Sequence, residues 1–236
     1  FGVAAATCMN QEECREAYAG FENLCFVERH GAEHYPYFGF DYELAGKRIA
    51  EKVISEDFHR IAVITDSMRF SNEHDFSRGL CSRFRGGKVK YTHITTDNRR
   101  VSHSMIDLLM KEEDYDAVVT SNIRFAEKIR HVVENFSLEQ PIPIFTLSSV
   151  TSLPEQDYRK YELNYGLLGR AVAETLIGES GEKQAQPEQL FENDGFRLWN
   201  QMECGSRPVK QLRILTIDSP ETMILKGLAR LYTKET

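Results

Sequence analysis

The sequence predicts an α/β protein in which parallel β-sheets are flanked by helices. Short apolar segments rich in Val, Ile and Ala alternate along the chain with longer amphipathic segments of helical period. Several apolar segments are hydrophobic throughout, which is typical of strands buried on both faces of a parallel sheet. Strands that alternate with helices in this way are joined by right-handed crossovers in nearly all sheets.

The N-terminal part of the chain contains two predicted strands and two predicted helices. The strands are residues 2–7 and 23–29, and the helix between them is residues 11–21. A longer helix follows over residues 41–56. It is amphipathic, because Ala45, Ile49 and Val53 share one face while Lys and Glu occupy the other.

The remainder of the chain continues the alternation. Strands are predicted at residues 59–67, 88–97, 117–120, 141–147 and 195–202, and helices at 72–84, 102–113 and 164–180. A further helix follows residue 122 and carries one apolar stripe, formed by Phe125, Ile129, Val132 and Phe136. Residues 184–189 are polar and form a predicted linker.

Small polar residues follow three of the predicted strands at the point where each strand ends. They are Asp66 and Ser67, Ser121 and Asn122, and Ser148. Because parallel α/β sheets bind ligands beyond the carboxyl ends of their strands, we predict that these residues form a ligand-binding rim. Ser121 and Asn122 have an alternative role as caps of the helix that follows them, and the two roles can coexist.

Composition excludes some functional classes. A net charge of −7 argues against nucleic-acid binding by this segment, which needs clustered Lys and Arg. The longest apolar run is shorter than the roughly 20 residues of a membrane span. Five irregularly spaced cysteines without a C-x-x-C pair favour reduced thiols and a cytoplasmic location, with an extracellular one as the alternative. The opening "FGVAAAT" lacks an initiator Met, so we expect an excerpt of a longer protein.

The sequence shows little that indicates a reaction. His30 and His34 have the spacing of a helical metal pair, but Gly31 places them in a predicted loop and a third ligand is not evident. His74 and Asp75 lie side by side without an accompanying nucleophile or phosphate-binding loop. We therefore expect a non-enzymatic protein without a metal or a cofactor.

The motifs, taken together and in order, resemble those of the lactose- and galactose-repressor (LacI/GalR) family of effector-binding domains, which are similar to type I periplasmic binding proteins. The match lies in four segments: "YPYFGFDYELAGKRIAEKVISEDFHRIAVIT", "DAVVTSNIRFAEKI", "PIPIFTLSSV" and "ELNYGLLGRAVAETLIG". Asp41, Gly46, His59, Arg60 and Ile61 occupy the positions that the first of these motifs specifies.

This resemblance implies two α/β lobes that clamp a small molecule between them. Residues 1–57 and 163–180 would form a first lobe, which is incomplete, and residues 58–160 and 185–207 the second. It also implies a homodimer in which ligand-dependent closure shifts the population between states. DNA would be bound only through a domain that is absent from this chain.

The residues with which the family usually grips a sugar are mostly replaced. Phe76, Ile123, Ser148 and Leu163 stand at the positions of the family's Arg, Asp, Asp and Gln, and Asn122 alone is retained. Because Arg and Asp clamp hydroxyl groups by charged hydrogen bonds, their loss favours a less polar effector than a sugar, an aromatic-stacked one, or none. Asp41 is predicted to cap a helix, and in the family its equivalent can also contact the effector.

Residues 208–236 form a predicted strand and helix, with Ser219 as the N-cap and Pro220 at the first helical position. They resemble the start of an extracellular solute-binding protein. They either begin a further domain or add to the incomplete first lobe. The leading hypothesis is the sensor core of a LacI-type regulator, and the alternative is an exported solute-binding component linked to transport.

Overall fold

The computed structural model describes residues 3–111, 114–135, 142–148, 158–177 and 188–191. They form two sheets in which every strand pairing is parallel. The four-stranded sheet has the order β1-β2-β3-β9, with β1 Val3–Ala5, β2 Leu24–Val27, β3 Tyr37–Phe40 and β9 Glu188–Phe191. The five-stranded sheet has the order β5-β4-β6-β7-β8, with β4 Arg60–Thr65, β5 Lys90–Thr95, β6 Ala117–Thr120, β7 Ile144–Ser148 and β8 Tyr158–Glu162. The prediction of an α/β fold with parallel sheets is confirmed.

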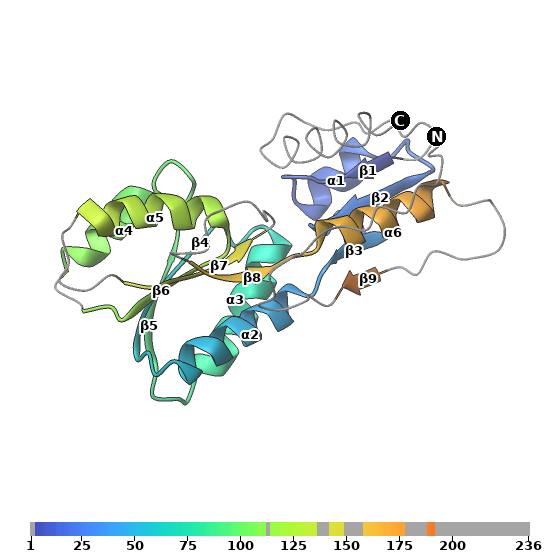
Figure 1. Cartoon of the computed structure of the whole chain (residues 1–236). Helices are drawn as coiled ribbons and strands as arrows, with labels where there is room; N and C mark the ends of the chain where they lie inside the picture. The colour runs from blue at the N-terminus through green and yellow to red at the C-terminus, as the bar shows by residue number, and fades with distance from the viewer. Residues whose placement is uncertain (1–2, 112–113, 136–141, 149–157, 178–187, 192–236) are drawn as a thin grey trace, which may run out of the picture.

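Helices cover both faces of the five-stranded sheet (Figure 1). They are α2 Tyr42–Ser55, α3 Ser71–Phe84, α4 Val101–Leu109 and α5 Ile123–Asn135. Alternate residues of β4 face opposite cores: Ile61 and Val63 pack with α2 and α3, whereas Ala62 and Ile64 pack with α4 and α5. This sheet and its four helices form the second lobe. Burial on both faces explains why its central strands are apolar throughout.

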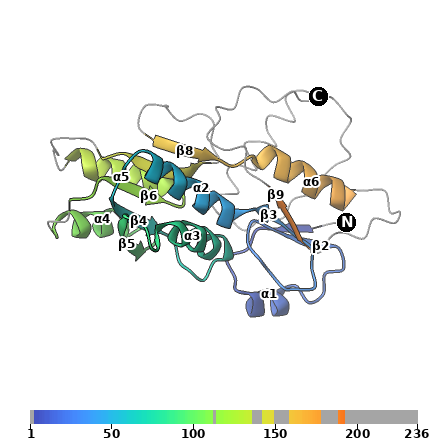
Figure 2. The ribbon, with the colours of Figure 1, turned by 90° about the horizontal axis from the view of Figure 1, so that it is seen from below.

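The four-stranded sheet lies between α1 Gln11–Ala17 and α6 Tyr165–Ile177 and forms the first lobe (Figures 1 and 2). Leu24 and Phe26 of β2 belong to a small core with Cys14 of α1. Cys25 and two aromatic residues of β3 belong to the large core shared with α6 and the second lobe. The described part of the first lobe therefore has one small core of its own, and its remaining buried hydrophobic residues belong to the large core that it shares with the second lobe.

Two glycines let α2 and α3 approach each other closely. A Cβ atom built on Gly46 would lie 2.2 Å from the Phe76 carbonyl oxygen, and one on Gly79 would lie 2.0 Å from the Glu43 carbonyl oxygen. Both neighbours are backbone atoms, which cannot move aside without shifting a helix. The contact joins the two helices into a single layer.

The structure corrects several details of the sequence analysis. Strands β3 and β8 were not predicted, because one is short and contains Gly39 and the other carries charged residues. Helix α2 packs on the second lobe, so the crossover between lobes lies near Asp41 rather than Asp57. Residues 188–191 were expected in the second lobe and instead pair with β3 of the first.

Several predicted features lie outside the described residues. They are Phe136, the strand at 195–202, Cys204 and the strand and helix within 208–236. None of the helices in the described part combines the length and the apolar character that a membrane crossing needs.

Candidate functional site

A pocket of about 980 Å³ lies between the two lobes. Its first-lobe wall comes from residues 9–12 beyond β1 and 29–30 beyond β2. Its second-lobe wall comes from residues 68–71 beyond β4 and from the first turns of α3. The start of α2, with Asp41, closes the end near the crossover. The pocket therefore lies where the carboxyl ends of strands from both sheets meet, which is where α/β folds bind ligands.

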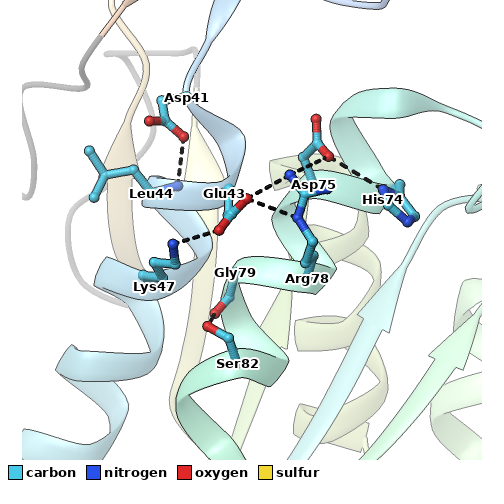
Figure 3. Close-up of polar contacts among 9 residues, drawn as sticks. All are labelled: Asp41, Glu43, Leu44, Lys47, His74, Asp75, Arg78, Gly79 and Ser82. Atoms are coloured by element: carbon cyan, nitrogen blue, oxygen red, sulfur yellow. Dashed lines mark hydrogen bonds and ion pairs between the residues drawn. The ribbon is translucent and has the colours of Figure 1, made fainter.

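One end of the pocket carries an ionic cluster on α2 and α3 (Figure 3). Glu43 Oε1 lies 2.5 Å from Lys47 Nζ, and Glu43 Oε2 lies 2.6 Å from Arg78 Nη2. Arg78 Nη2 also lies 3.1 Å from Asp75 Oδ1, which contacts His74 Nδ1 at 3.3 Å. Hydrogen bonds from Lys47 and Arg78 hold the pKa of Glu43 below its usual value. Both carboxylates of this cluster, Glu43 and Asp75, therefore already form ion pairs with basic side chains.

The other end of the pocket is lined by arginine and aromatic side chains. The Arg29 guanidinium lies 4.1 Å from the centre of the Phe70 ring, and that of Arg69 lies 4.8 Å from it. The His30 ring stacks on Tyr37 with centroids 3.9 Å apart. The backbone N–H of His30 donates to Ser71 Oγ at 2.9 Å. The Arg29–Phe70 contact and the His30–Ser71 hydrogen bond join the lobes, because Arg29 and His30 belong to the first lobe and Phe70 and Ser71 to the second.

A buried carboxyl group lies behind this end of the pocket. Glu73, in the first turn of α3, is 5% exposed, and its Oε2 accepts a hydrogen bond from the Asp66 N–H at 3.1 Å. Burial raises the pKa of Glu73 to about 7, a shift that the Ser121 hydroxyl opposes and the Asp66 carboxylate reinforces. Glu73 thus brings together the ends of β4 and β6.

The structure places five of the predicted residues at the carboxyl edge of the second lobe. Asp66 Oδ1 accepts from the Ser67 N–H at 2.6 Å. Ser121 is 6% exposed and adjoins Glu73, whereas the Asn122 side chain caps α5 by accepting from the Phe125 N–H at 3.0 Å. Ser148 is 2% exposed at the end of β7. Whether this rim contacts a ligand stays a prediction.

The other two predicted residues have different positions. Asp41 caps α2 by accepting from the Leu44 N–H at 2.8 Å, and it is the one residue of the predicted seven that lines the pocket. Phe76 is fully buried in the core beneath α2. The structure therefore gives Phe76 a role in the core, and a contact between Phe76 and a ligand stays a prediction.

The arginine end of the pocket and the region behind it contain residues that were not predicted from the sequence as site residues, namely Arg29, Arg69, Phe70 and Glu73. Arg29 ends a predicted strand, as the rim residues of the other lobe do, and that position was a usable signal. Arg69 and Phe70 lie in an ordinary connection between strand and helix. Glu73 was hidden because a Glu in a helical segment is usually exposed.

A second polar contact lies at the junction of the lobes. Glu28, at the end of β2, has a positive φ of 69°. Its Oε1 accepts hydrogen bonds from the hydroxyls of Tyr42 and Tyr165, which begin α2 and α6. The Tyr37 hydroxyl donates to the Glu28 carbonyl oxygen at 3.0 Å. One first-lobe residue is thus tied to the two helices that follow the crossovers.

The described residues contain no group of three or more His, Cys, Asp or Glu side chains arranged to hold a metal ion. The His30 ring stacks on Tyr37, and the His34 ring lies tilted against Tyr35, so the two histidines pack against different rings.

Comparison with known proteins finds similarity of structure. No protein-family model matches the chain, and no curated protein matches its sequence. One similar solved structure is the Cra transcriptional dual regulator from Pseudomonas putida in complex with fructose 1-phosphate. The two structures superpose with a TM-score of 0.72 at 13% sequence identity, and the match covers 84% of this chain and 78% of the Cra chain. GanP, a glucose-galactose binding protein from Geobacillus stearothermophilus, matches with a TM-score of 0.67 at 17% sequence identity. This match covers 82% of this chain and 75% of the GanP chain.

A third similar structure is a sugar-binding transcriptional regulator of the LacI family from Escherichia coli, complexed with phosphate. It matches with a TM-score of 0.68 at 11% sequence identity, and the match covers 83% of this chain and 75% of the regulator chain. Regulators and sugar-binding proteins therefore share this architecture. The chain has the two-lobed fold of LacI-type effector-binding domains and type I periplasmic binding proteins.

Proposed function

We propose that this chain is the ligand-sensing core of a LacI-type transcriptional regulator, which binds a small molecule between its lobes and has no enzymatic activity. The observation that carries the proposal is the interlobe pocket, whose walls come from the carboxyl ends of strands in two separate parallel sheets. Ligands that contact both walls favour a closed arrangement of the lobes, and a regulator transmits such a change to its partners.

The binding rim includes Asp66, Ser67, Ser121, Asn122 and Ser148 in this proposal, together with Asp41 at the crossover. These rim residues offer hydroxyl, amide and carboxylate groups, and Ser148 stands at a position where the family usually has Asp. Regulation further implies a cytoplasmic homodimer whose DNA contacts are made by another domain of the full-length protein. The regulators of similar fold support this version.

A thermal-shift screen tests whether the pocket binds a ligand. The panel contains sugars, sugar phosphates, nucleosides and amino-acid-like compounds, because structures of similar fold are complexed with a sugar, a sugar phosphate or phosphate. We expect at least one compound to raise the melting temperature, since a ligand that binds only the folded state stabilises it. The shift should shrink in Phe70→Leu, which alters the pocket wall, and persist in Phe21→Leu, whose ring is outside the pocket. A panel without any stabilising compound would contradict the proposal.

The second candidate is an exported solute-binding component of a transport system. It is favoured by the likeness to GanP and by the resemblance of residues 208–236 to the start of an extracellular solute-binding protein. Cell fractionation of the full-length protein separates the two. Recovery with the cytoplasm and selective retention of a DNA sequence supports the regulator, and recovery outside the cytoplasm supports the transport component.

A further inference from the structure

We propose that the ligand of the interlobe pocket carries an anionic oxygen group, a carboxylate or a phosphate, which Arg29 and Arg69 bind from opposite lobes. The inference rests on the proposed function, because it names the chemical class of ligand for the same pocket. It differs from a neutral sugar, which the family's charged clamp would hold through hydroxyl groups.

The two guanidinium groups lie beside the same aromatic ring. Both line the pocket, and both lie within 5 Å of the centre of the Phe70 ring, at 4.1 Å for Arg29 and 4.8 Å for Arg69. Because both distances are measured from one ring centre, the two guanidinium carbons lie at most about 9 Å apart, a span that one anion with two or more oxygens can bridge. A guanidinium presents a fork of N–H donors that matches the two oxygens of a carboxylate or phosphate.

Three of the four acidic residues that line the pocket already have partners. Glu43 and Asp75 at the ionic end are occupied by Lys47 and Arg78, and Asp41 accepts the N–H that begins α2. The fourth acid, Glu12, is exposed in the first turn of α1. Arg69 makes no ion pair with any residue that the structure describes.

Arg69 therefore keeps its charge without an acidic partner among the described residues, whereas the Arg29 side chain donates to the Thr7 carbonyl oxygen at 3.3 Å and its charge lowers the pKa of Glu73. If the anionic group of a ligand binds at the arginine end, an apolar or planar remainder of the ligand can pack against neighbouring aromatic rings. Phe70 and the stacked His30 and Tyr37 rings supply them.

The two arginines come from different lobes, so an anion bound by both bears on lobe closure. Arg29 follows β2 of the first lobe, and Arg69 follows β4 of the second. An anion that contacts both therefore links the two lobes, beside the existing hydrogen bond from His30 N–H to Ser71 Oγ. The charged ligand favours the closed arrangement because only there do both guanidiniums reach it.

The experiment measures binding of inorganic phosphate and pyruvate to the protein by calorimetry and by melting temperature, with sodium chloride at equal ionic strength as the reference. We expect at least one of the two anions to raise the melting temperature above the chloride reference. Its affinity should fall as ionic strength rises, because the contact is electrostatic. The variant Arg69→Gln should lose about tenfold or more in affinity, since a hydrogen bond to a charged group is lost.

The matched control is Arg99→Gln, which removes an exposed arginine that lies outside the pocket. Arg69 itself is exposed and belongs to none of the three hydrophobic cores, so the variant is expected to fold. Unchanged anion affinity in Arg69→Gln, or an equal loss in Arg99→Gln, would overturn the inference.

The outcomes also separate this inference from the proposed function. If uncharged sugars or nucleosides stabilise the protein and neither phosphate nor pyruvate does, the sensor proposal stands and the anionic ligand is wrong. If neither the anions nor the neutral compounds stabilise it, both are contradicted. If only phosphate binds, the group recognised is a phosphoryl group, and if only pyruvate binds, it is a carboxylate.

Discussion

The contact between α2 and α3 differs in kind from the contact between the two lobes. Backbone meets backbone at Gly46 and Gly79, inside the second lobe, and the space left there is too small for a methyl group. The lobes meet instead through side chains, as in the Glu28–Tyr42 hydrogen bond and the Arg29–Phe70 stack. A backbone contact has one arrangement, whereas side chains can separate and rejoin. Motion of this protein is therefore expected between the lobes and not within the α2–α3 layer.

The largest expected effect breaks the α2–α3 contact. Gly79→Ala places a methyl group 2.0 Å from the Glu43 carbonyl oxygen, and should lower the free energy of unfolding by about 3 kcal/mol or more. Urea denaturation followed by circular dichroism measures it. Gly169→Ala is the matched control, because a Cβ atom there has no neighbour within 4 Å, and it should be neutral or slightly stabilising. Equal stability of the two variants would mean that the helices are not in close contact.

A smaller effect concerns the pH dependence of stability. Glu73 has its pKa raised from an ordinary 4.5 to about 7 by burial, so the folded state holds this proton more tightly than the unfolded state does. Its contribution therefore favours folding at low pH and is lost as pH rises from about 4.5 to 7, by about 2 to 3 kcal/mol. Denaturation curves across this range should show a smaller fall in Glu73→Gln. The same fall in wild type and variant would show that Glu73 does not titrate as described.

The junction of the lobes predicts the next effect. Tyr165→Phe removes one of two hydroxyls that donate to Glu28, and should cost about 1 kcal/mol. A double-mutant cycle with Glu28→Gln isolates the coupling, which should be clearly different from zero because the groups are in direct contact. Additive single effects would indicate that the hydroxyl and the carboxylate act independently and that α6 is held to the first lobe by packing alone.

The smallest effect is expected at the ionic end of the pocket. Lys47→Met removes one of the two cations on Glu43, and should change the free energy of unfolding by about 0.5 kcal/mol, because partly exposed ion pairs contribute little. The change should shrink further in 1 M salt. Arg48→Met, on the same helix and paired with Glu51, provides the comparison. A loss above 2 kcal/mol for Lys47→Met would assign this cluster a structural role that its exposure does not suggest.

Much of the architecture could be predicted from the order of apolar and amphipathic segments. The central strands β4, β6 and β7 were predicted because burial on both faces requires residues such as Ile61, Val119 and Phe145 to be apolar. Strand β8 was missed because Arg159 and Lys160 interrupt the pattern at the edge of the sheet, where burial is partial. The resemblance carried by the motifs at Asp41 and Asn122 predicted the two-lobed fold.

The sequence by itself determined the strand–helix alternation, the polar ends of the strands and the caps at Asp41 and Asn122, because these depend on residues close together in the chain. Only the tertiary structure decided that Phe76 is core, that Glu73 is buried between two strand ends, and that Arg29 and Arg69 share one aromatic ring. Those arrangements join residues up to about 50 positions apart in the chain, and their energies depend on the burial and distance that folding alone produces.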